Sequence, residues 1–495
     1  MALIQVKNLT FGYEGNPEWV FDQASFQLDT NWKTGLIGRN GRGKTTLLRL
    51  LLGEYPHQGV ISCPVPMVYF PFSVSNLEKS TAMVVQSIAP ECDRWQIERE
   101  LSLLRVDCDV LDRSFNTLSN GEQTKVLLAT LFLHENRFLL IDEPTNHLDE
   151  EARDAVCRYL SGKKGFILVS HDRVLLDGCV DHILSINRAD IEVQAGNFQS
   201  WQENRNRQDQ FERSEQEKLR KEVDRLDRAA HRAADWSDKT EKSKYDTRNS
   251  GLRPDRGFVG HKAAKMMKRS KTIEARREAA VEEKAKLLKN LEQAEPLRLS
   301  LLHYPKRVLV EAEHLSAFYG EKEVFSDVRF SIQQGDRVAV CGKNGCGKST
   351  LLNLLLGKPI AFEGNLRIDG NLVVSCVPQE TSGLCGSLRS LAEKEGVEES
   401  LLKTILRKLG FSREQFSRNI EAYSEGQKKK VLLAKSLCKP AHLYIWDEPL
   451  NFIDVISRMQ VEDLLLACRP TLLFVEPDAR FCDEIATRRI RIRRE

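Results

Sequence analysis

Residues 38–46 read GRNGRGKTT, and residues 342–350 read GKNGCGKST. Both stretches fit the pattern GxxxxGK[ST]. An apolar stretch precedes each one, at residues 34–37 and 337–341, and Leu-rich sequence typical of a helix follows. This order predicts a phosphate-binding loop, because glycines let backbone N–H groups close on phosphate oxygens at a helix N-terminus. A purely structural glycine turn is the alternative, which the repetition of the flanking elements disfavours.

Two further stretches recur at the same distance along the chain. LSNGEQ at 118–123 returns as YSEGQ at 423–427, and LLIDEPTNHLD at 139–149 returns as YIWDEPLNFID at 444–454. The offsets of the three repeats are 304, 305 and 305 residues, which indicates a duplication. The sequence therefore predicts two α/β domains, residues 1–200 and 299–495, separated by residues 201–298.

Each copy has an apolar stretch that ends in two acids, Asp142 and Glu143 in the first and Asp447 and Glu448 in the second. An Asp at the end of a strand can hold Mg²⁺, and the next Glu can orient or deprotonate an attacking water. An isolated Asp-Glu pair is usually a solvated strand end. Here it follows each phosphate-binding loop by about 100 residues, so it predicts ATP hydrolysis.

The segment between the copies carries the basic charge of the chain. Residues 242–271 contain ten Lys and Arg and two Asp, a net +8 in a chain of net +3, so the remainder sums to −5. Apolar residues recur at intervals of three and four on both sides of this segment, and Gly and Pro interrupt it between 251 and 260. This pattern predicts an antiparallel helical hairpin with a basic tip.

A basic tip of this kind suits a partner rich in phosphates and bases, such as folded RNA, while a solvated charged helix is the alternative. The candidate RNA-binding residues are Lys242, Lys244, Arg248, Arg253, Arg256, Phe258, Lys262, Lys265, Lys268, Arg269 and Lys271.

With its LSNGEQ and YSEGQ motifs, the chain resembles the ABC ATPases, in which two nucleotide-binding domains pair head to tail. The resemblance implies that Ser119 and Gly121 face ATP held at Lys348, and that Ser424 and Gly426 face ATP held at Lys44. It also implies adenine stacking on Tyr13 and Tyr319, for which core packing is the alternative. The remaining ATP-binding candidates are Gly38, Asn40, Gly41, Gly43, Thr45, Thr46, Gly342, Asn344, Gly345, Gly347, Ser349, Thr350 and Gln379. The Mg²⁺ candidates are Thr45, Asp142, Ser349, Asp447 and Gln379, and the catalytic candidates are Glu143, Glu448 and His171.

The two copies depart from the ABC pattern in complementary ways. The second copy has the expected Gln, Gln379, where the first has Phe72, and the first has the expected His, His171, where the second has Pro477. Phe and Pro side chains cannot hydrogen-bond a water or a phosphate. We therefore expect slow or conditional hydrolysis.

The twin domains with a charged helical linker of roughly a hundred residues resemble the ABC-F family of ribosome-associated proteins, over essentially the whole chain. Within it, TNWKTGLIGRNGRGKTTLLRLL at 30–51 and KAAKMMKRSK at 262–271 are similar to the Lsa-like antibiotic-resistance branch. The resemblance implies a monomer, its two domains paired within the chain, that binds the E site of the 70S ribosome. The linker would approach 23S rRNA and the P-site tRNA and displace lincosamides, streptogramin A or pleuromutilins.

Two other functions remain open. One is a housekeeping ABC-F translation factor that relieves stalled ribosomes, and the other is the ATPase subunit of a transporter; a DNA-binding ABC protein is a weaker third. No apolar run approaches the roughly 18 residues of a membrane span, so we expect a cytoplasmic protein without a transmembrane subunit. The 12 cysteines form no CxxC pair, which favours reduced thiols over a metal site.

Overall fold

The computed structural model describes residues 2–14, 19–74, 76–134, 136–146, 148–187, 190–243, 297, 299–343 and 345–492, and nine residues between 261 and 276. The chain divides into two compact units. One comprises Met1–Gln199 and Ala294–Glu495, and the other comprises Ser200–Gln293.

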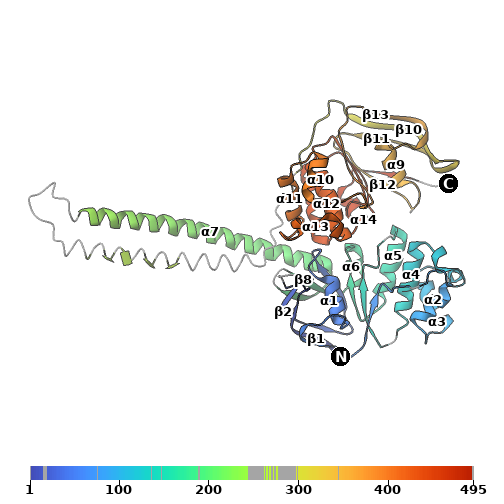
Figure 1. Ribbon diagram of the computed structural model, residues 1–495, viewed down its shortest axis with the longest axis horizontal. Helices are drawn as coiled ribbons and strands as arrows, with labels where there is room; N and C mark the ends of the chain where they lie inside the picture. The colour runs from blue at the N-terminus through green and yellow to red at the C-terminus, as the bar shows by residue number, and fades with distance from the viewer. Residues whose placement is uncertain are drawn as a thin grey trace, which may run out of the picture. The chain divides into compact units, whose positions relative to one another are not determined.

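The first copy contains a large, mainly parallel sheet and a small antiparallel sheet (Figure 1). The large sheet has the order β5 (Met67–Phe70), β6 (Phe138–Asp142), β7 (Phe166–Val169), β3 (Lys33–Gly38), β8 (His182–Ile186) and β9 (Ile191–Ala195), and only β9 is antiparallel. The small sheet has the order β2 (Phe21–Asp29), β1 (Leu3–Phe11) and β4 (Gln58–Ser62). The helices are α1 (Lys44–Leu51), α2 (Thr81–Ile88), α3 (Arg94–Leu103), α4 (Asn120–Leu131), α5 (Glu150–Ser161) and α6 (Arg173–Cys179), with 3-10 helices at Cys108–Leu111 and Phe115–Thr117.

The second copy repeats this arrangement. Its parallel sheet has the order β14 (Val374–Val377), β15 (Leu443–Asp447), β16 (Leu472–Val475), β12 (Arg337–Cys341) and β17 (Arg488–Arg491). Its small sheet has the order β11 (Lys322–Gln333), β10 (Val308–Tyr319) and β13 (Ala361–Ile368). The helices are α9 (Lys348–Leu355), α10 (Leu388–Glu395), α11 (Glu399–Lys408), α12 (Glu425–Cys438), α13 (Val455–Cys468) and α14 (Ala479–Ile485), with 3-10 helices at Gln415–Ser417 and Ile420–Ala422.

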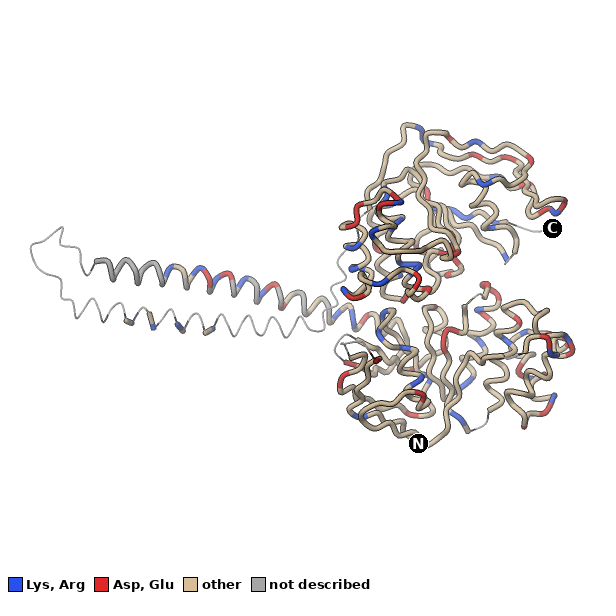
Figure 2. The backbone as a smooth tube through the Cα atoms, viewed as in Figure 1, with Lys and Arg blue, Asp and Glu red and all other residues tan. Residues whose placement is uncertain are grey.

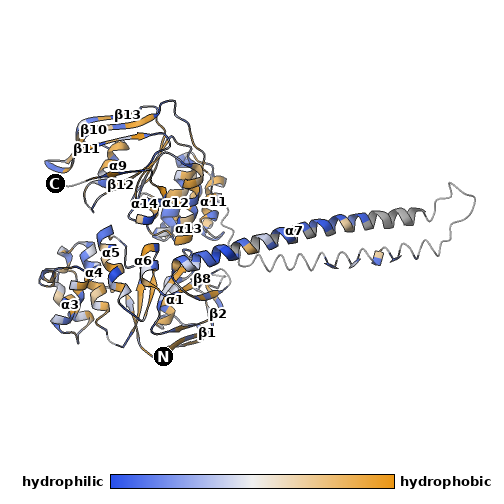
Figure 3. Cartoon of the chain, turned by 180° about the vertical axis from the view of Figure 1, so that it is seen from behind, coloured by the Kyte–Doolittle hydropathy of each residue, from blue (hydrophilic) through white to orange (hydrophobic). Residues whose placement is uncertain are grey.

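The central strands are apolar because helices cover both faces of a parallel sheet. All five residues of β15 are buried, as are the first four of β6. Figure 3 shows hydrophobic residues concentrated within the two copies. The prediction of two tandem α/β domains is confirmed. Strands β1 and β10 are 9 and 12 residues long, and their antiparallel pairing continues through register shifts with both neighbours.

The linker begins with a long helix, α7 (Phe198–Ser243), of 46 residues. At about 1.5 Å per residue it spans about 70 Å. Figure 2 shows acidic and basic residues interspersed along its described part. Ion pairs there include Lys218 with Glu215 and Lys221 with Glu217. The nine described residues between 261 and 276 are also helical. The predicted helix breakers lie outside the described residues.

Candidate functional site

Both glycine-rich loops adopt the conformation that a phosphate-binding loop requires. Each loop follows an interior strand of its parallel sheet, β3 or β12, and leads into a helix at its lysine. Gly43 and Gly347 stand at the N-caps of these helices with φ of 88° and 97°. A Cβ at either position would lie 2.6 Å from a valine methyl group, Val20 Cγ1 or Val324 Cγ1. Only glycine satisfies both constraints, so each loop can wrap closely around an anion at the helix N-terminus.

The two loop lysines point back into their own loops. Lys44 Nζ donates to Gly38 O at 2.8 Å, and Lys348 Nζ donates to Gly342 O at 2.8 Å. Lys44 is buried, whereas Lys348 is half-buried. Burial lowers the pKa of Lys44, and this effect is opposed by Asp454 and Glu143.

In the first copy, β6 brings its two acids to the loop. Thr45 Oγ1 donates to Asp142 Oδ2 at 2.8 Å, and Tyr69 OH donates to the same oxygen at 3.1 Å. Burial raises the pKa of Asp142, although both hydrogen bonds oppose the shift. A hydroxyl and a carboxylate oxygen this close together are ligands that Mg²⁺ prefers.

Glu143 lies just beyond β6 in a strained backbone position. Its φ is 51°, a value that non-glycine residues adopt rarely and mostly at functional sites. Its Oε1 lies 3.3 Å from His171 Nε2. Burial, followed by the charge of Asp142, raises the pKa of Glu143 to about 8, and burial lowers the pKa of His171 well below its usual value. The histidine is therefore neutral near pH 7, able to donate or accept one hydrogen bond.

The second copy repeats the strain but not the histidine contact. Glu448 has a φ of 46°, and its Oε2 accepts from Asn451 Nδ2 at 3.4 Å. Burial raises the pKa of Asp447, and a hydrogen bond with Ser349 opposes the shift. Asp447 Oδ1 is buried and has no hydrogen-bond partner among the described residues. Buried oxygens are normally hydrogen-bonded, so this one fits the role of a cation ligand.

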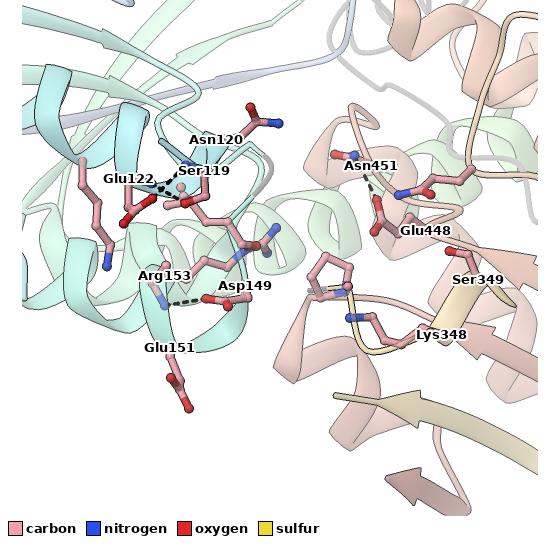
Figure 4. Close-up of a pocket in the computed structure, with 18 of the residues that line it drawn as sticks. Ser119, Asn120, Glu122, Asp149, Glu151, Arg153, Lys348, Ser349, Glu448 and Asn451 are labelled. Atoms are coloured by element: carbon pink, nitrogen blue, oxygen red, sulfur yellow. Dashed lines mark hydrogen bonds between the residues drawn. The ribbon is translucent and has the colours of Figure 1, made fainter. Parts of the chain in front are cut away.

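A pocket of about 1100 Å³ lies between the first copy's LSNGEQ turn and the second copy's phosphate-binding loop (Figure 4). The first copy contributes Ser119, Gly121 and Asp149 to its lining. From the second copy the lining includes Tyr319, Gly345, Gly347, Lys348, Ser349, Thr350, Gln379, Glu448 and Pro477. In Figure 4, Ser119 and Asp149 lie on one side, with Lys348, Ser349 and Glu448 on the other. Most of the residues that the sequence analysis assigned to ATP at Lys348 thus line one cavity, although Gly342 is not part of the lining.

The loop at Lys44 makes direct contacts with the second copy. Asn40 N donates to Asp454 Oδ2 at 3.1 Å, and Asn40 Nδ2 donates to Phe452 O at 2.7 Å. A Cβ at Gly426 would lie 2.4 Å from Phe452 O and 2.5 Å from Asn40 Nδ2. Glycine is therefore required where α12 meets the loop. Ser424 caps α12 beside this contact, where its Oγ accepts from Gln427 N.

Several residues at this junction escaped the sequence analysis. Lys430 Nζ lies 2.6 Å from Asp454 Oδ2, and both side chains are buried. Arg173, at the start of α6, forms a second buried ion pair with Glu462 of α13, across the two copies. Neither Arg173 nor Glu462 belongs to a recurrent motif. The sequence could have indicated this pair only if α6 and α13 had been expected to pack against each other.

The remaining candidates vary in their surroundings. Tyr13 is 44% exposed, its ring packs edge-on against Phe11, and its hydroxyl lies 2.8 Å from Thr46 Oγ1. Tyr319 is 54% exposed. Phe72 packs near Phe70 and His134.

Much of the predicted RNA-binding set cannot be placed. Lys265, Lys268 and Lys271 are exposed helical residues, and Lys242 belongs to α7. Outside the described residues lie Asn344 and the linker candidates Lys244, Arg248, Arg253, Arg256, Phe258, Lys262 and Arg269.

Residues 21–146 and 325–451, which contain both loops and both acidic strands, match the ABC transporter family. The chain belongs to this family. Its two tandem ABC ATPase domains bind ATP and give it ATP hydrolysis as its activity. Among the described residues, no helix has the length and apolarity needed to cross a membrane.

Similar proteins extend over nearly the whole chain. The ribosome protection protein VmlR of Bacillus subtilis is 29% identical, with 95% of this chain and 84% of that protein covered. The erythromycin resistance ATP-binding protein MsrA of Staphylococcus epidermidis is 26% identical, with 92% and 91% covered. The ATP-binding protein Uup of Caulobacter vibrioides is 28% identical, with 94% and 74% covered. These relatives support the assignment to the ABC-F family and do not single out the Lsa-like branch.

Among solved structures, the archaeal ribosome recycling factor aABCE1, in complex with ribosomal stalk protein aP1, is similar with a TM-score of 0.63. The identity is 18%, with 99% of this chain and 88% of that chain covered. This similarity concerns the fold alone.

Proposed function

We propose that this ABC ATPase is a cytoplasmic ribosome-binding protein of the ABC-F type, which protects the ribosome from antibiotics. The pocket lined by Ser119 and Gly121 of one copy and by Lys348 of the other supports a role for ATP in the pairing of the copies. A nucleotide bound there would contact both copies, so its binding and hydrolysis would change how the copies pair.

The nucleotide would be held by residues from both copies. Lys44 and Lys348 would bind the β- and γ-phosphates, and Ser119, Gly121, Ser424 and Gly426 would contact the nucleotide from the opposite copy. Thr45 with Asp142, and Ser349 with Asp447, fit Mg²⁺, which would neutralise phosphate charge when bound. Glu143 and Glu448 would orient or deprotonate water.

The partner is inferred from the linker. Residues 242–271 carry a net +8, and among them Lys265, Lys268 and Lys271 are exposed at intervals of three on a helix, which places them within about a third of its circumference. A row of ammonium groups of this kind binds the phosphate backbone of RNA. The names of VmlR and MsrA support a ribosomal target and a role in resistance.

In the proposed cycle, the ATP-bound protein enters the E site of the 70S ribosome. Its linker approaches 23S rRNA and the P-site tRNA, and displaces lincosamides, streptogramin A or pleuromutilins from the peptidyl-transferase centre. Hydrolysis would then be slow and coupled to the ribosome, since Phe72 and Pro477 replace the polar side chains of the family pattern.

The proposal is tested by trapping. Glu143→Gln with Glu448→Gln should hold the ATP-bound protein on 70S particles, so that it pellets with them in ATP but not in ADP. If the doubly substituted protein stays in the supernatant in ATP, ribosome binding in the closed form is wrong.

The linker has its own test with a matched control. Changing Lys265, Lys268 and Lys271 to Gln should weaken pelleting with ribosomes and leave ATP hydrolysis without ribosomes unchanged. The control changes Lys218, Lys221 and Arg225, exposed residues of α7 outside the basic segment, to Gln. Equal losses in both variants would contradict a specific role for the basic segment.

A translation factor that relieves stalled ribosomes without drugs is the second candidate, and the similarity to Uup favours it. Deletion of the gene decides between them. A target-protection protein changes drug susceptibility, whereas a translation factor changes growth and polysome profiles in drug-free medium.

A further inference from the structure

The second copy contains a buried lysine that belongs to none of the motifs discussed so far. Lys429 lies on α12 and is 1% exposed. Its Nζ donates to Pro378 O at 2.9 Å, to Gln379 O at 2.9 Å and to Asp447 O at 3.3 Å. Three acceptors use all three hydrogens of an ammonium group.

These acceptors belong to two different parts of the pocket wall. Pro378 and Gln379 lie in the loop after β14, and Asp447 is the last residue of β15, directly before Glu448. The side chains of Gln379 and Glu448 both line the pocket at Lys348. The ammonium group of Lys429 thus joins the backbones that carry these two side chains.

The surrounding charges are consistent with a charged lysine. A buried ammonium is strongly unfavourable unless it is hydrogen-bonded and near negative charge. Burial lowers the pKa of Lys429, and the carboxylates of Glu476, Glu448 and Asp447 oppose this shift. Glu476 is itself buried and accepts a hydrogen bond from Leu450 N at 3.2 Å.

The first copy has no such tie. Thr124 stands at the position of Lys429, and its hydroxyl donates to Asn120 O within α4. Ser170 stands at the position of Glu476, and its Oγ lies 3.5 Å from Thr145 Oγ1. The first copy instead joins β5 to its acidic strand through Tyr69 and Asp142.

We propose that Lys429 is a positioning residue for the ATPase site at Lys348, because it fixes the Gln379 loop to the end of β15 and thereby sets the separation of Gln379 and Glu448. Without the histidine of the first copy, this half depends on Gln379 as its polar sensor, so the placement of the loop controls the rate of hydrolysis. The inference rests on the proposed roles of Gln379 and Glu448.

The test measures one round of ATP hydrolysis in the full-length protein, in a Glu143→Gln background that leaves the Lys348 half as the source of hydrolysis. Lys429→Met keeps the length of the side chain and removes the three donors. We expect a rate about tenfold lower, the size that coupling energies between contacting residues give. Thr124→Met, the matched change in the first copy, should alter the rate less than about twofold.

A double-substitution cycle separates positioning from a general loss of packing. If Lys429 acts through the Gln379 loop, Lys429→Met should reduce the rate by less than about twofold once Gln379→Ala is present. If the two substitutions lower the rate independently, so that their fold-reductions multiply in the double variant, the inference is overturned. An unchanged rate in Lys429→Met would overturn it as well. If Lys429→Met does not fold, Lys429→Thr with Glu476→Ser installs the first copy's residues and should give the same kinetic result.

Failure of the underlying roles gives a different outcome. If Glu448→Gln and Gln379→Ala both leave the rate unchanged, the proposed roles at this site are wrong, and the inference falls with them. If they lower the rate while Lys429→Met does not, only the positioning role is wrong.

Discussion

The half of the molecule built on Lys44 and the half built on Lys348 carry the same three motifs and differ in how the two copies meet. At Lys44 the loop is hydrogen-bonded to the second copy through Asn40. At Lys348 a pocket of about 1100 Å³ lies between the copies, and the loop contacts the first copy through an exposed ion pair of Lys343 with Glu151. Asn40, Phe452 and Asp454, which form the contacts at Lys44, lie within the repeated stretches 38–46 and 444–454. A duplicated site can therefore keep its motifs and change how the motif residues of the two copies meet.

The largest effect is expected from the two glutamates. Glu448→Gln should lower single-turnover hydrolysis in the Lys348 half by roughly 100-fold or more, the size expected from loss of a general base. Glu143→Gln provides the comparison for the other half. Rapid-quench measurement of each variant tests whether the halves contribute unequally, and equal rates in both variants would contradict a functional difference.

The second prediction concerns the buried pair of Lys430 and Asp454. Asp454→Ala removes the carboxylate that faces the buried ammonium group of Lys430, which should lower the free energy of unfolding by about 3–5 kcal/mol. Asp149→Ala is the matched control, because both aspartates cap a helix. This variant should lose only the capping hydrogen bond, which lowers the free energy of unfolding by about 1 kcal/mol. Urea unfolding followed by circular dichroism compares them. Similar losses of unfolding free energy in the two variants would show that the ion pair of Lys430 and Asp454 adds no stability beyond the helix cap.

The third prediction concerns Arg173 and Glu462, whose counterparts at the matching positions are Ala479 and Cys157. Arg173→Ala should destabilise the protein by about 2–3 kcal/mol, since it leaves a buried carboxyl group unpaired. Burial already raises the pKa of Glu462 to about 6, so protonation limits the loss. Arg173→Ala with Glu462→Cys should recover most of the stability in a thermal melt. A double variant that is less stable than Arg173→Ala alone would contradict this account.

The smallest expected effect is on pH dependence. The pKa of Glu143 in the folded protein is about 8, above the ordinary value of 4.5 for a glutamate, so the folded state binds an extra proton between these two pH values. Its contribution to stability is full below about pH 4.5 and is lost as the pH rises through 8, with a slope of at most about 1.4 kcal/mol per pH unit. Thermal melts from pH 6 to 8.5 should show a shallower decline for Glu143→Gln than for the unsubstituted protein. Identical slopes would show that Glu143 does not titrate in this range.

Most of the fold could be predicted from the sequence. The repeats fixed the two α/β domains, and the short apolar runs located β3, β6, β12 and β15, because buried parallel strands are apolar along their whole length. The full extent of β1 and β10 could not be predicted, since their outer parts are held by pairing with neighbouring strands. The length of α7 could not be predicted, because its recurring apolar residues indicate a helical period without marking the residue at which the helix ends.

The sequence by itself determined which residues could carry the chemistry. The glycines, lysines, hydroxyls and carboxylates of the motifs follow from local backbone geometry and the needs of phosphate and Mg²⁺. Only the tertiary structure decided which residues that are distant in the sequence come into contact. Lys429 with the Gln379 loop, Arg173 with Glu462 and Asn40 with Asp454 are contacts over 50 to 414 residues. Such contacts depend on the packing of whole elements against one another, which has no periodicity or motif in the sequence.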